Sequence, residues 1–115
     1  GTKDEGDVFR AKIPVQENCF DSTGKLSLEQ LMVLIGKAKN FVSCSTGPMH
    51  IAGYLGVNTI GLFSPKRPIH PGRWKAIGSN VKTLVFDEKC GNCSKAKKCN
   101  CIENISVQSV LEKLT

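Results

Sequence analysis

Residues 45–50, Ser-Thr-Gly-Pro-Met-His, combine two hydroxyls, a glycine and a histidine within a very short stretch. The apolar run before them, residues 41–44, has the length of a buried strand, and Pro48 suits the first turn of a helix. The N–H groups at a helix start have no partners inside the helix and carry partial positive charge. A phosphate or diphosphate is therefore one ligand that this corner could bind, with Gly47 allowing close approach and His50 turned toward the same anion.

Three other interpretations of the corner remain open. A serine-hydrolase elbow needs a glycine two residues before its nucleophile, where this sequence has Ser43, and His50 is badly placed to act as the base for Ser45. A thiol phosphatase built on Cys44 would need an arginine where His50 stands. The corner could also be purely structural, with His50 an ordinary core residue.

The elements expected around the corner alternate as in a parallel α/β sheet with helices on its faces. A capping box at residues 27–30, followed by apolar residues at helical spacing, predicts a helix over residues 27–39. A second helix is expected to start at Pro48 and to stop near Gly56, and a last one to begin at Ser106. Three strands are predicted, at residues 41–44, 58–63 and 81–86.

The remaining segments are less regular. Residues 64–74 carry three prolines and are predicted to form an irregular loop. An edge strand is expected over residues 11–15. Residues 1–10 are expected to be flexible or left over from an expression vector, so that residues 1–115 form a single domain. A chain of this length has room for one modest core.

Positive charge is concentrated in the second half of the chain. The net charge is +6, and residues 66–98 carry nine basic side chains against two acidic ones. Such an excess favours an anionic partner, although a solvated basic surface explains it equally well. Lys66 and Arg67 could reach a bound phosphate or face an anionic acceptor. No apolar run is long enough to cross a membrane, and a cytoplasmic protein, peripheral at most to the inner membrane, is expected.

Four of the six cysteines form a cluster: Cys90, Cys93, Cys99 and Cys101. Four thiolates could hold a tetrahedral zinc ion, but the single residue between the last two departs from the usual pairs of Cys-x-x-Cys. Free thiols or an oxidised loop are the alternatives. The metal-binding state of the cluster is therefore left open.

The stretch that begins at Thr23, TGKLSLEQLMVLIGKAKNFVSCSTGPMHIAGYLGVNTIGLFSP, resembles the C-terminal half of family 9 glycosyltransferases, the lipopolysaccharide heptosyltransferases. Those enzymes show Thr-Gly-Lys-x-Ser-Leu before a helix and then a strand that ends in Asp-[Ser/Thr]-Gly-Pro-x-His-x-Ala. A second strand and a proline-rich loop follow. The resemblance covers residues 23–78, and Ser45 stands where the family usually has aspartate.

The resemblance implies a Rossmann-like parallel sheet with flanking helices, the C-terminal, donor-binding half of a GT-B enzyme. It implies a nucleotide-sugar donor such as ADP-heptose, a lipopolysaccharide core acceptor and inverting transfer without a required cofactor. The donor-binding residues are then expected to be Ser45, Thr46, Gly47, Met49, His50, Lys66 and Arg67. No catalytic residue is assigned, because the general base is expected in an N-terminal domain of the same enzyme. This chain alone is expected to be inactive.

Two alternatives to an active donor-binding domain stay open. One is a basic α/β module that binds nucleic acid, although nucleic acid is not the expected partner because no reading motif accompanies the charge. The other is a catalytically inactive relative in which the corner is purely structural.

Overall fold

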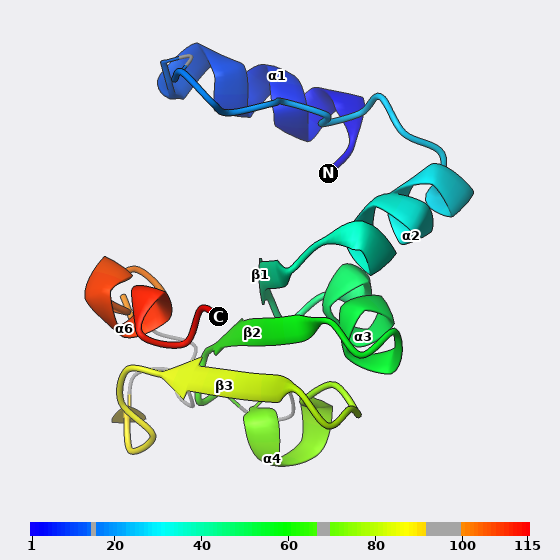
Figure 1. The fold of residues 1–115 in the computed structure, drawn as a ribbon. Coiled ribbons are helices and arrows are strands. Elements are labelled where there is room, and N and C mark those ends of the chain that lie inside the picture. The colour runs from blue at the N-terminus through cyan, green and yellow to red at the C-terminus, as the bar shows by residue number, and fades with distance from the viewer. Residues whose placement is uncertain (15, 67–69, 92–99) are drawn as a thin grey trace. The chain divides into compact units, whose positions relative to one another are not determined.

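The computed structural model describes residues 1–14, 16–66, 70–91 and 100–115. The chain divides into two compact units, Gly1–Val33 and Leu34–Thr115. Helix α2 begins in the first unit and ends in the second (Figure 1). In chain order the elements are α1 (Lys3–Lys12), α2 (Leu28–Lys37), β1 (Asn40–Cys44), α3 (Gly47–Tyr54), β2 (Asn58–Phe63), α4 (Pro71–Trp74), β3 (Val81–Val85) and α6 (Val107–Leu111).

The second unit is built on a parallel sheet with strand order β1-β2-β3 (Figure 1). Asn40 pairs with Asn58, and Thr59 pairs with Val81, so all three strands point the same way. Helix α3 connects β1 to β2, and the segment that contains α4 connects β2 to β3. The predicted Rossmann-like α/β fold is confirmed. The three carboxyl ends of the strands therefore meet at one edge of the sheet, next to the start of α3.

The core lies between α3, β2 and the chain that follows α4. Met49, Phe63 and Ala76 are buried together, with Val81 and Val85 packed against them. The central strand β2 is buried at five of its six positions, as its continuous apolar sequence predicts for a strand covered on both faces. This packing fixes the base of α3 against the sheet.

Helix α3 also packs closely on the segment that leads to β3. A Cβ atom added at Gly53 would lie 2.9 Å from the Cβ of Ala76, and one added at Gly78 would overlap the Gly53 carbonyl. Glycine at both positions allows the two backbones to touch. Gly56 ends the helix with a φ of +77°, at the position where the sequence predicted the stop.

Two of the predicted helix starts are confirmed by their caps. The Ser27 amide donates to Gln30 Oε1 at 2.9 Å, and the Gln30 amide donates to Ser27 Oγ at 3.2 Å. Ser106 Oγ accepts from the Ser109 amide at 3.1 Å at the start of α6. Helix α2 ends at Lys37, earlier than the predicted residue 39, and α4 is a short helix inside the segment predicted to be an irregular loop.

The predictions for the N-terminal segment are corrected. Residues expected to be flexible form helix α1, which also includes part of the predicted edge strand. The helix starts from a second capping box: the Thr2 amide donates to Glu5 Oε2 at 2.7 Å, and the Glu5 amide donates to Thr2 Oγ1 at 3.3 Å. Thr-x-x-Glu is the standard form of this motif, so the sequence does carry the signal. Residue 15 lies outside the described residues, and the single-domain prediction stays untested.

Within the part of the chain that the structure describes, no helix has the length and apolar character needed to span a membrane.

The apolar face predicted for α2 is only partly covered. Ile35 is buried, whereas Leu28 and Met32 are exposed.

An ion-pair cluster ties α1 to the loop after it. The Arg10 guanidinium donates to Asp7 Oδ1 at 2.8 Å and to Asp21 Oδ2 at 2.6 Å. The Thr23 amide donates to Asp21 Oδ1 at 2.9 Å. The hydrogen bond from Arg10, with those from Thr23, holds the pKa of the Asp21 carboxyl far below its ordinary value.

Because the folded-state pKa of Asp21 is lowered, its stabilising effect is complete above the ordinary carboxyl pKa and is lost as the pH falls below about 4. Asp21→Asn should therefore reduce protection of the α1 amides against hydrogen exchange at pH 6–7. The difference from the unmodified chain should shrink as the pH is lowered below 4. Glu17→Gln is the control, since Glu17 makes no ion pair within the described residues. A difference that stays constant from pH 7 to pH 3 would contradict the prediction.

Candidate functional site

The corner between β1 and α3 lies at the carboxyl end of the sheet. Thr46 is the N-cap residue, with extended backbone at φ −124° and ψ 171°, and Pro48 lies in the first turn of the helix. The Thr46 amide donates to the Cys44 carbonyl at 2.7 Å, and the Met49 amide donates to the Thr46 carbonyl at 3.1 Å. Two main-chain N–H groups of the corner are therefore already paired.

The hydroxyls of the corner are turned back toward the strand. Thr46 makes no side-chain cap; its Oγ1 donates instead to the Cys44 carbonyl at 3.3 Å. Ser43 Oγ lies 3.1 Å from Thr46 Oγ1 and donates to the same carbonyl at 2.9 Å. Ser45 is half-buried, and its hydroxyl has no hydrogen-bond partner among the described residues.

Gly47 is the residue of the corner with an unpaired amide and free space around it. The residue is exposed, and its amide has no acceptor within the described part of the chain. A Cβ atom placed on Gly47 would have no neighbour within 4 Å. Because Pro48 has no N–H to donate, the Gly47 amide is the group at this helix start that an anion can approach directly.

His50 is neither exposed nor a core residue with all its hydrogen bonds made. It is half-buried, and its Nε2 atom is buried without a hydrogen-bond partner in the described structure. The Trp74 ring packs edge-on against the imidazole, with centroids 5.4 Å apart and an angle of 85° between the planes. Leaving a buried nitrogen unpaired costs about 1–3 kcal/mol, so a hydrogen bond to this atom would stabilise the structure.

The side chain of Met49, a residue predicted to lie at the donor, is part of the core. Its side chain is 0% exposed and packs with Phe63 and Ala76 in the core. The residue follows Gly47 by two positions on a helix, so it points to the sheet while Gly47 faces solvent. Met49 supports the corner from below.

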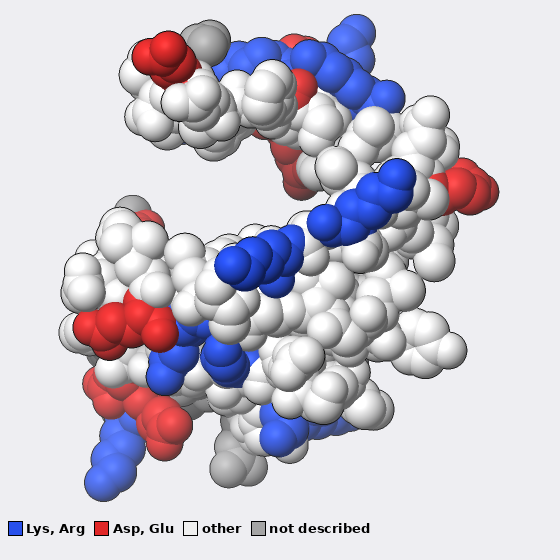
Figure 2. Space-filling view, viewed as in Figure 1, with Lys and Arg blue, Asp and Glu red and all other residues white. Residues whose placement is uncertain are grey.

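The proline-rich loop is only partly described. Lys66 is exposed, and its amide donates to Ser64 Oγ at 3.2 Å. Arg67 lies outside the described residues. So do Lys95, Lys97 and Lys98, which belong to the basic segment found in the sequence. Figure 2 shows the described Lys and Arg side chains of one face interspersed with acidic and neutral residues.

The cysteine cluster cannot be assembled from the described residues, because Cys93 and Cys99 lie outside them. Of the other two, Cys101 is buried and Cys90 is half-buried. Within the described ranges, no group of three or more His, Cys, Asp or Glu side chains could hold a metal ion. The zinc hypothesis stays untested.

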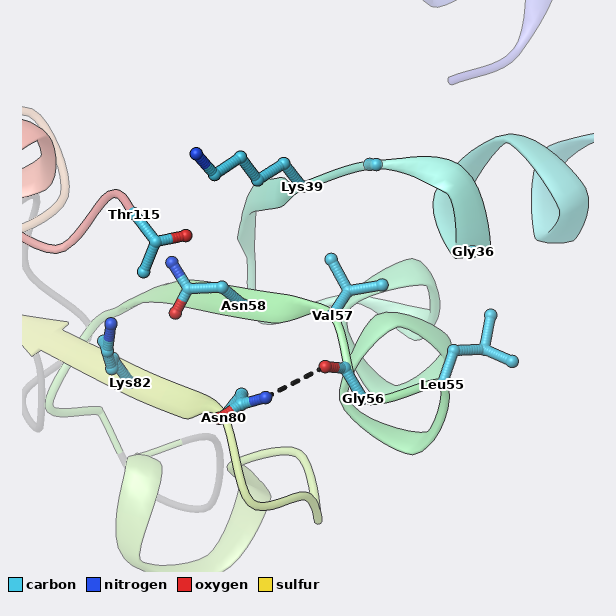
Figure 3. A pocket seen from close by; sticks show the side chains of 10 residues that line it. Gly36, Lys39, Leu55, Gly56, Val57, Asn58, Asn80, Lys82 and Thr115 are labelled. Carbon is cyan, nitrogen blue, oxygen red and sulfur yellow. Dashed lines mark hydrogen bonds between the residues drawn. The ribbon is translucent and has the colours of Figure 1, made fainter.

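A separate cavity of about 360 Å³ lies at the amino ends of the strands, away from the corner (Figure 3). Three of the polar side chains that line it donate hydrogen bonds to main-chain carbonyls. Asn58 Nδ2 donates to the Lys113 carbonyl at 3.0 Å, and so does Lys82 Nζ. Asn80 Nδ2 donates to the Gly56 carbonyl at 3.1 Å, the bond drawn in Figure 3. These contacts hold the C-terminal residues and the end of α3 to the sheet.

Comparison with known proteins assigns the chain to a family. The model of glycosyltransferase family 9 (heptosyltransferase) matches residues 1–102. The chain belongs to glycosyltransferase family 9. The family 9 match includes residues 1–10, so the expectation that they come from an expression vector is wrong.

Two similar proteins extend this comparison. A Haemophilus influenzae protein named "Putative glycosyltransferase" is 32% identical over 75 residues, which are 65% of this chain and 20% of that protein. The structure of E. coli ADP-heptose lipopolysaccharide heptosyltransferase II aligns with a TM-score of 0.73 and 21% identity. That alignment covers 98% of this family 9 chain and 33% of the E. coli chain, and it shows a shared fold. The chain thus spans a fifth to a third of these two proteins.

The burial of Met49 yields a test that separates core packing from ligand contact. Met49→Ala should lower the free energy of unfolding by about 2–5 kcal/mol because it leaves a cavity beneath the corner. Met49→Leu, which nearly conserves volume, should cost less than about 1.5 kcal/mol and leave the affinity for ADP unchanged. Urea unfolding and calorimetric titration measure the two quantities. A Met49→Leu chain of normal stability that loses ADP affinity would place this side chain at the ligand instead.

Proposed function

We propose that this chain is the donor-binding part of a heptosyltransferase-like enzyme and that the corner Ser45–His50 binds the diphosphate of a nucleotide sugar such as ADP-heptose. The observation that carries the proposal is the unpaired, exposed Gly47 amide at the carboxyl end of β1. Ligands of open parallel sheets collect at this edge. Membership of a glycosyltransferase family supports the same conclusion.

The charges around the corner favour a diphosphate. The start of α3 provides partial positive charge, and no carboxylate occurs among residues 43–50. Ser45, at the position of the usual family aspartate, supplies a hydroxyl that can donate a hydrogen bond. His50 can add a hydrogen bond through its unpaired Nε2. Thr46 shapes the corner through its main chain, since its hydroxyl is engaged by Cys44.

In the proposed reaction, a hydroxyl of a lipopolysaccharide core acceptor attacks the anomeric carbon of heptose. The bond from that carbon to the diphosphate breaks, the configuration inverts, and ADP leaves with the electron pair. Donors at the corner stabilise the charge that develops on the leaving diphosphate. Lys66 and Arg67 are proposed to assist from the adjoining loop. The general base is proposed to come from an N-terminal domain of the enzyme, so the chain by itself should bind donor without transferring sugar.

Gly47→Ala tests the proposal at the position that the structure leaves open. The added methyl group meets no protein atom, and the φ of Gly47 lies outside the left-handed region, so the chain should fold normally. A diphosphate held against this amide would collide with the methyl group. We expect ADP affinity to fall about tenfold or more, the loss equivalent to one hydrogen bond to a charged group. Isothermal titration calorimetry measures the affinity, and thermal unfolding checks the fold.

Gly36→Ala is the matched control. It adds the same methyl group in helix α2, where the nearest side-chain atom, Leu55 Cδ1, lies at an ordinary contact distance of 3.6 Å. ADP affinity should not change. Equal affinity of the Gly47→Ala and unmodified chains for ADP would refute the proposed site. A chain that binds a short oligonucleotide more tightly than ADP would favour the nucleic-acid alternative, and one that binds neither would favour an inactive relative.

A further inference from the structure

We propose that Trp74 is a positioning residue for His50, holding the imidazole with its Nε2 atom unpaired until a diphosphate oxygen reaches it. The inference rests on the function proposed above and assigns a role to a side chain outside the Ser45–His50 corner. Its starting point is the edge-on contact of the two rings, with centroids 5.4 Å apart.

The ring contact is anchored on both sides. His50 follows Met49, which is fully buried in the core. Trp74 precedes Ala76 by two residues, and Ala76 packs against Met49 in the same core. The two side chains therefore extend from segments that are fixed to each other beneath them.

The backbone around Trp74 is fixed as well. The Trp74 amide donates to the His70 carbonyl at 3.1 Å, and the Lys75 amide donates to the Pro71 carbonyl at 3.2 Å. Just beyond, the close approach of Gly53 and Gly78 presses this segment onto α3. Trp74 is 45% exposed, so the residue contacts the imidazole while part of it faces solvent.

An indole suits this role because of its hydrogen-bonding chemistry. Its one polar group is an N–H donor, and it has no acceptor to offer to an imidazole N–H. Trp74 therefore packs against the His50 ring without an acceptor that could satisfy a protonated Nε2. The nitrogen keeps its full capacity to bind a phosphate oxygen. Because Nε2 is buried, a neighbouring group must move before an anion can reach it. The proposal places this movement at the ring pair: the indole shifts or the imidazole turns, and either movement changes the ring contact.

This requirement gives a direct signal, because Trp74 is the single tryptophan of the 115-residue chain. Titration with ADP or with pyrophosphate should produce a saturable change in tryptophan fluorescence, and adenosine should not. His50→Phe is the control variant. It keeps an aromatic ring against Trp74 but has no ring nitrogen, so the response to pyrophosphate should disappear. Circular dichroism checks that this variant is folded.

Substitutions of Trp74 complete the test by calorimetry. Trp74→Ala should weaken ADP binding about three- to tenfold, the range expected for the loss of an edge-on aromatic pair. Trp74→Phe, which can restore such a pair, should bind within about twofold of the unmodified chain. Because Trp74 is partly exposed, both variants should fold normally, and thermal unfolding checks this.

The possible failures are distinguishable. ADP binding by calorimetry without a change in fluorescence, or equal affinity of Trp74→Ala and the unmodified chain, overturns the role of Trp74 alone. An equal response to adenosine also overturns it, since the indole would then stack on the base. Absence of ADP binding by the unmodified chain in calorimetry overturns the proposed function and this inference together.

Discussion

A helix that begins directly after a parallel strand has N–H groups that the helix cannot satisfy, and the function proposed for this chain depends on where those groups face. At the end of β1 most are accounted for: the Thr46 and Met49 amides are paired locally, and Pro48 has none. The Gly47 amide remains, exposed to solvent at the edge where parallel sheets bind ligands. The absence of a side chain keeps the approach to it open.

The buried layer beneath the corner holds this arrangement in place. Met49 sits in the same helical turn as Gly47 and His50, and its side chain packs with Phe63 and Ala76. Since Ala76 also anchors the segment that carries Trp74, one small apolar cluster fixes the amide, the imidazole and the indole. Packing in the core therefore fixes the relative positions of residues 47, 50 and 74, although no hydrogen bond joins their backbones. A change that leaves a cavity in that cluster should therefore disturb binding and stability together.

The sequence predicts the sheet well because its strands and helix starts carry local signals. The continuous apolar run of β2, the cap at Ser27 and the stop at Gly56 each act within a few residues, and the structure has all three. The cap at Thr2 is as clear a signal, but it lies in a segment whose polar composition predicts flexibility. Local patterns do not predict which residues distant in the sequence pack against each other.

Met49 and Trp74 illustrate that limit. A motif places Met49 beside the binding residues, yet the helix turns it toward a core that only the folded chain creates. The contact of Trp74 with His50 joins residues 24 positions apart through an irregular segment, and no periodicity predicts it. Family membership fixes the fold, whereas the residues proposed to meet the ligand follow from burial and hydrogen bonding.

The most direct measurement is a two-dimensional ¹H–¹⁵N spectrum of the chain recorded during titration with pyrophosphate. If the open helix start binds the diphosphate, the Gly47 amide should show a large, saturable shift, with smaller shifts at Ser45 and His50. The amides of Asn58 and Asn80, at the opposite end of the strands, should stay in place. An unmoved Gly47 resonance at saturating pyrophosphate, or shifts confined to the opposite end of the sheet, would contradict the central claim.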